Sequence, residues 1–61
     1  MSKSLFKKDH FYTKEAQKLD SETLHATKDL FEKYVEKGYS PREIEYIMNK
    51  TIFDISLEHL L

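Results

Sequence analysis

Hydrophobic residues in the last third of the chain fall on two opposite sides of a predicted helix over residues 41–60. Successive residues of an α-helix are about 100° apart, so spacing assigns each position to a face. The first face, here called the isoleucine stripe, consists of Ile44, Ile47, Met48, Thr51, Ile52 and Ile55, with His59 alongside. The opposite face, here called the aromatic stripe, consists of Tyr46, Phe53, Leu57 and Leu60, with Leu61 at its edge. A single antiparallel partner helix can cover only one of the two stripes, and we expect it to cover the isoleucine stripe and to leave Tyr46, Phe53 and Leu57 exposed to water.

An earlier segment has one apolar face and predicts an amphipathic helix over about residues 21–37. Asp20 or Ser21 can cap its start, and Glu22 suits the positive end of the helix dipole. Extending this helix back to Thr13 brings Asp20 into the apolar half. The pattern therefore predicts a break or bend in the chain near Leu19 and Asp20. A separate short helix that starts at Thr13 can precede this break.

The only glycine and the only proline of the chain lie three positions apart, between the two predicted helices. Gly38 suits the left-handed residue that ends a helix. Ser40, Pro41 and Glu43 match a helix start, with a capping residue, proline in the first turn and an acid that can complete a capping box. Short connections of this kind join antiparallel neighbours, so the sequence predicts an all-α helical hairpin.

A chain of 61 residues forms one domain at most, and its hydrophobic core is small. We expect an N-terminal arm over residues 1–19 that is partly disordered or short-helical, and a hairpin over residues 20–61. Two hairpins that associate as a homodimeric four-helix bundle would supply the missing core. The alternative is a closed monomer in which Phe6, Phe11 and Tyr12 fold over the aromatic stripe.

Charge divides the chain into a basic arm and an acidic body. Residues 1–18 contain five lysines and two acids, whereas residues 19–61 contain nine acids and five bases, for a net charge of −1. There is no cysteine, which is compatible with a reducing compartment. No run of hydrophobic residues has the length of a membrane span, and the first residues do not resemble a signal peptide. These features predict a cytoplasmic protein without a membrane partner.

Residue types for catalysis are scarce. A single glycine excludes a glycine-rich phosphate-binding loop. His25 with Asp29 can form a local pair or half of a metal site, but zinc requires three or four ligands. His59 suits the negative end of its helix dipole. We therefore predict no enzyme, metal, cofactor or small-molecule substrate, with a metal or phosphotransfer site built on His25 as the remaining enzymatic alternative.

The order of elements also invites comparison with DNA-binding proteins. Leu19, the turn at residues 38–40 and the apolar second helix together resemble ribbon-helix-helix repressors over about residues 11–56. That resemblance implies a dimer in which one short strand from each chain pairs and enters the major groove. Phosphate contacts would then come from the basic arm. The candidate side chains are Lys7, Lys8, Lys14 and Lys18.

A helix-turn-helix within the last third is a weaker alternative, because Asp54 and Glu58 would make its recognition helix acidic. The hypothesis favoured by the sequence is a non-catalytic protein–protein interaction module that acts as a regulator, inhibitor or adaptor by occluding a partner surface. The partner is a second copy, a target protein or both. We expect the interface to centre on the aromatic stripe, with aromatic side chains as its anchors.

Overall fold

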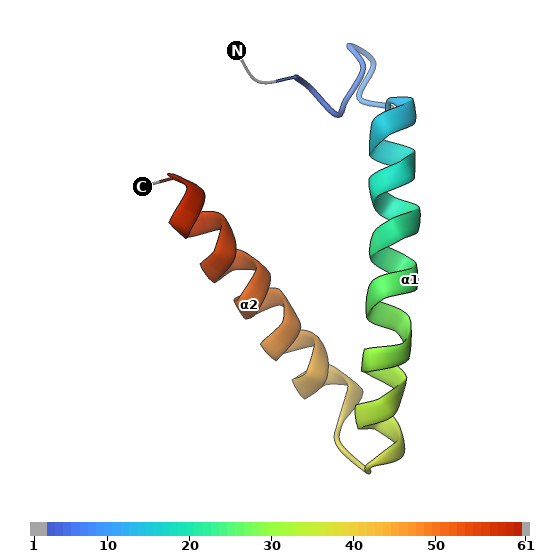
Figure 1. Ribbon diagram of the computed structural model, residues 1–61, viewed down its shortest axis with the longest axis vertical. Helices are drawn as coiled ribbons and strands as arrows, with labels where there is room; N and C mark the ends of the chain where they lie inside the picture. The colour runs from blue at the N-terminus through green and yellow to red at the C-terminus, as the bar shows by residue number, and fades with distance from the viewer. Residues whose placement is uncertain (1–2, 61) are drawn as a thin grey trace.

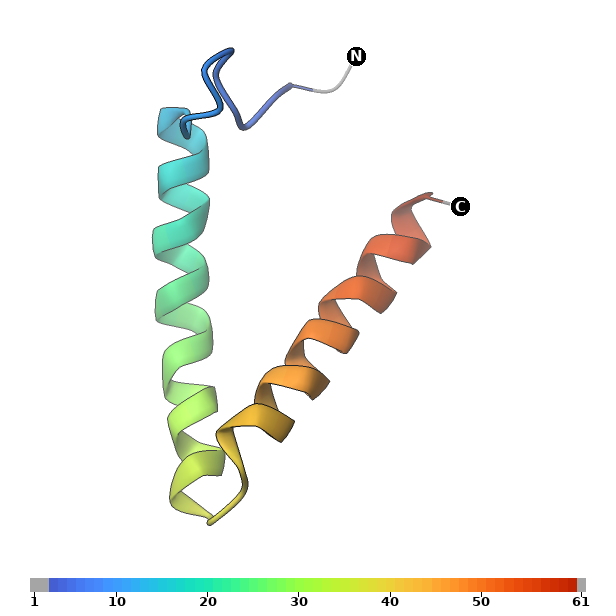
Figure 2. The same ribbon diagram turned by 180° about the vertical axis from the view of Figure 1, so that it is seen from behind.

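The computed structural model describes residues 3–60 and contains two α-helices in that range, α1 (Lys14–Glu36) and α2 (Pro41–Leu60). A short turn joins the end of α1 to the start of α2, and the two helices diverge from this turn. The molecule therefore has the shape of a V (Figures 1 and 2). The all-α prediction is confirmed, as is a hairpin-like order of two helices with few contacts between them. Leu61, predicted at the edge of the aromatic stripe, lies outside the described residues.

Helix α1 begins seven residues earlier than predicted, at Lys14 instead of position 21. Thr13 is its N-cap, with extended backbone and a hydroxyl that accepts a hydrogen bond of 3.2 Å from the Ala16 N–H. The predicted break near Leu19 and Asp20 is wrong, because α1 continues through both residues. Both side chains are exposed, so Asp20 meets no apolar core that would exclude it from the helix.

Removing the Thr13 cap tests where α1 begins. The Thr13 hydroxyl accepts from Ala16 and also donates to the Leu5 carbonyl at 3.1 Å. Thr13→Ala is expected to lower the free energy of unfolding by about 1 kcal/mol, the usual cost of losing an N-cap. Thermal unfolding followed by circular dichroism measures this, with Ser21→Ala, an exposed hydroxyl residue inside α1, as the control. Equal loss in both variants would contradict the cap.

The turn after α1 satisfies the last carbonyls of the helix in a Schellman motif. The Gly38 N–H donates to the Val35 carbonyl at 2.9 Å, and the Tyr39 N–H donates to the Tyr34 carbonyl at 3.2 Å. Gly38 has φ of 97°, a left-handed conformation that favours glycine. Helix α2 then starts at Pro41, so the predicted roles of the glycine as helix terminator and of the proline at the first helical position are confirmed.

Before α1, residues 4–13 form a compact turn that we call the hook. An isolated antiparallel bridge joins Phe6 and Tyr12, whose rings meet edge to face with centroids 5.5 Å apart. The hook lies against the first turns of α1, where Ala16 is buried. Residues 14–19 are helical and Thr13 caps them, as the short-helix option has it, but they belong to α1 and not to a separate arm. The hook aromatics do not fold over the aromatic stripe, so the closed monomer is not the arrangement found.

Only two side chains are buried in the described part of the chain, Ala16 and Ile44. The Cα radius of gyration is 14.6 Å, whereas a compact domain of this length has about 10.5 Å. We expected α1 to cover the isoleucine stripe. Ile44 is buried and Met48 is partly covered, but Ile47, Ile52 and Ile55 are more than half exposed, so the expectation is wrong for most of the stripe. The two helices touch near the turn and leave most of their facing surfaces uncovered.

Candidate interaction surfaces

The aromatic stripe lies on the side of α2 that points away from α1. Ile44 is buried against α1, and Phe53, nine residues later, is rotated from it by about 180° in an α-helix. Tyr46, Leu57 and Leu60 lie within about 40° of the Phe53 direction by the same step. All four side chains are exposed, from 40% for Leu57 to 77% for Leu60. The structure thus places the four predicted interface residues together on one open face.

The borders of the aromatic stripe are polar. Lys50 and Asp54 form an exposed ion pair of 3.1 Å on one border. Asn49 and Ser56 occupy the other border, as their spacing along the helix requires. An apolar centre with a polar rim is the usual composition of a protein–protein interface.

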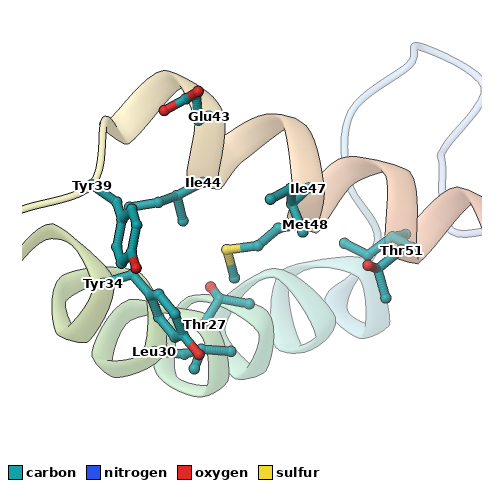
Figure 3. Close-up of a pocket in the computed structure, with 10 residues that line it drawn as sticks. Thr27, Leu30, Tyr34, Tyr39, Glu43, Ile44, Ile47, Met48 and Thr51 are labelled. Carbon is teal, nitrogen blue, oxygen red and sulfur yellow. The ribbon is translucent and has the colours of Figure 1, made fainter. Parts of the chain in front are cut away.

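A second apolar surface, the groove, lies between the two helices, with a volume of about 740 Å³. Figure 3 shows Met48 extending from α2 toward Thr27 of α1, and the ring of Tyr39 directed from the turn toward Tyr34. Among residues 3–60, Glu43 is the only charged residue that lines the groove, and it lies at the edge near the turn. The other lining residues are Leu30, Ile44, Ile47, Thr51 and Ile52.

The contribution of α1 to this groove is not evident from the sequence. Thr27, Leu30 and Tyr34 belong to the apolar half of the helix, which was expected to be covered by α2. Their spacing was therefore a usable signal, but it does not give the angle at which two helices diverge. Tyr34 also carries the Lys37 ammonium 4.7 Å above its ring, which adds a cation–π contact at the vertex of the V.

The predicted nucleic-acid contacts are distributed over two elements. Lys7 and Lys8 lie in the hook, and Lys14 and Lys18 lie in the first two turns of α1; all four are exposed. The strand that the ribbon-helix-helix resemblance implies is not present in residues 3–60, where the single bridge pairs the hook with itself. The turn needed by the helix-turn-helix alternative is likewise absent, because α2 is continuous.

The described residues show no cluster of side chains around His25 that could bind a metal ion. The His25 Nδ1 lies 2.8 Å from the Ser21 carbonyl, a local contact one helical turn away. Among residues 3–60, no three or more His, Cys, Asp or Glu side chains are grouped to hold a metal ion. Over the same range, no helix has the length and hydrophobicity required to span a membrane.

Comparison with protein-family models, with curated proteins and with solved structures gives no match to this chain.

Proposed function

We propose that this chain is a non-catalytic protein–protein interaction module that uses the aromatic stripe of α2 to occlude a surface of a target protein, as a regulator, inhibitor or adaptor. The observation that carries the proposal is the exposure of Tyr46 and Phe53, at 71% and 60%, on the side of α2 away from α1. Contiguous exposed apolar patches usually mark interaction sites. Aromatic side chains are also enriched at protein interfaces.

The spacing of the stripe favours a particular mode of recognition. Tyr46, Phe53, Leu57 and Leu60 stand at positions i, i+7, i+11 and i+14, which is the pattern of a helix that lays one face into a partner's hydrophobic groove. From first to last they span about 21 Å along the helix axis. The Lys50–Asp54 pair at the border would fix orientation more than affinity, because exposed ion pairs contribute little energy.

Two matched substitutions on α2 test this proposal. Phe53→Asp places a charge at the centre of the aromatic stripe, whereas Ser56→Asp places the same charge on its polar border. Each variant and the parent serve as bait in extract from cells that express the chain, and retained proteins are quantified by mass spectrometry. We expect at least one protein to be retained equally by the parent and by Ser56→Asp, and to be lost by Phe53→Asp. The affinity of Phe53→Asp for that protein should be lower than the affinity of the parent by about 30-fold or more, as for a hot-spot residue.

If every protein retained by the parent is retained equally by Phe53→Asp, the aromatic stripe is not the binding surface.

The alternative function, a DNA-binding regulator, is tested by titrating a DNA duplex with the chain at two salt concentrations. Binding through the lysines of the hook and α1 would weaken steeply as the salt concentration rises. Phe53→Asp should leave that binding unchanged.

A further inference from the structure

The monomer exposes far more surface than a compact chain of its mass. Its accessible surface is 6208 Å², whereas a folded monomer of 7.3 kDa exposes about 4,200 Å². The excess is about 2,000 Å² per chain by that relation. Two copies that each bury this excess would form an interface of about 4,000 Å² in total, within the range of obligate homodimers.

Part of the exposed apolar surface lies on the facing sides of the V. Ile47, Ile52 and Ile55 of the isoleucine stripe are 63%, 57% and 51% exposed, and Leu30 across the groove is 48% exposed. A small molecule that fills the groove would leave Ile55 uncovered, because this residue lies beyond the groove lining. An occupant must therefore extend along the helices, as another helix does.

We infer that the occupant is a second copy of this chain, and that two V-shaped hairpins interlock so that α2 of each copy lies in the groove of the other. By itself the chain buries only two side chains among residues 3–60, and so small a fold gains stability from additional core. The isoleucine stripe runs from Ile44 to His59, with Thr51 near its midpoint. Self-pairing of this stripe about a two-fold axis places Thr51 beside its own copy.

This arrangement assigns different partners to the two sides of α2. The isoleucine stripe enters the dimer, and the aromatic stripe, about 180° away on the helix, remains outside. Self-association and target binding then do not compete for one surface. The absence of competition depends on the proposed function, because it requires a target on the aromatic stripe, whereas the dimer does not depend on the proposed function.

Sedimentation equilibrium of the full chain and two Asp variants tests the dimer. We expect a dimeric parent, a Phe53→Asp variant that stays dimeric, and an Ile52→Asp variant whose dissociation constant rises by at least about 30-fold. Helix content of the parent should fall on dilution, because assembly stabilises the fold. A parent that is monomeric at every concentration would overturn the inference and leave the groove to a helix of another protein.

Cross-linking tests the interface without relying on a variant that could unfold. The chain has no cysteine, so a single introduced cysteine can form a disulfide only between copies. Thr51→Cys is expected to give a covalent dimer under mild oxidation, and Ser56→Cys, on the border of the aromatic stripe, is the matched control. Equal cross-linking of both variants, or loss of the dimer in Phe53→Asp with retention in Ile52→Asp, would overturn the proposed interface.

Loss of target binding and loss of the dimer are separable outcomes. Phe53→Asp should remain dimeric and lose the target, which tests the proposed function alone. A monomeric Ile52→Asp variant that keeps the helix content of the parent should still present the aromatic stripe. A dimer that fails to form in the parent contradicts the inference about the groove and leaves the test of the aromatic stripe intact.

Discussion

Proline at position 21 is expected to destabilise the chain by roughly 3 kcal/mol, the usual cost of proline inside a helix. Ser21 is the eighth residue of α1. Proline there removes the N–H that bonds to the carbonyl of residue 17, and its ring clashes with that carbonyl. Had α1 begun at residue 21, as the hydrophobic pattern and the capping residues predict, the same proline would occupy the first helical position and be tolerated.

Lys14→Pro is the matched control for Ser21→Pro. Position 14 is the first residue of α1, where an N–H has no partner within the helix. Thr13 before it has φ of −72° and ψ of 172°, a conformation that the residue preceding proline readily adopts. Thermal unfolding by circular dichroism at one protein concentration should show a large loss for Ser21→Pro and a small change for Lys14→Pro. Equal stability of the two variants would contradict a continuous α1.

The position of the turn between the helices could be predicted from the sequence, because the residues and hydrogen bonds that form it are close together along the chain. The hydrogen bonds of the Gly38 and Tyr39 N–H groups reach back no more than five residues, and a glycine followed by Ser40 and Pro41 specifies such an ending and restart. The continuity of α1 through Leu19 and Asp20 was missed for a different reason. The prediction excluded Asp20 from an apolar face, but an exposed face imposes no such exclusion.

The faces of α2 were also assignable from the sequence, since helical spacing alone separates the two stripes. The angle between the helices was not, because it depends on side chains that meet only in space. At the vertex the rings of Tyr34 and Tyr39 lie 6.1 Å apart, at the turn end of the groove (Figure 3). A groove with lining residues from both helices, including Leu30 and Met48, follows from that divergence.

Replacing Gly38 with L-alanine and with D-alanine is expected to shift stability in opposite directions. The backbone of Gly38 has φ of 97°, and a Cβ built on it meets no heavy atom within 4 Å. Backbone strain is therefore the only direct cost of L-alanine, and for an L-residue in a left-handed conformation it is roughly 1–2 kcal/mol. D-alanine favours positive φ and restricts the unfolded chain, so it should stabilise by about 0.4–1 kcal/mol.

A chain of this length is accessible to chemical synthesis, which allows the two enantiomers to be compared in otherwise identical proteins. Chemical denaturation at equal protein concentration should order the free energies of unfolding as D-alanine, glycine, L-alanine, from highest to lowest. The same side-chain atoms are added in both cases, so a difference between them reports the sign of φ at position 38 and not packing. If both alanines change stability equally, the left-handed helix ending is absent, and with it the constraint that sets where α2 departs from α1.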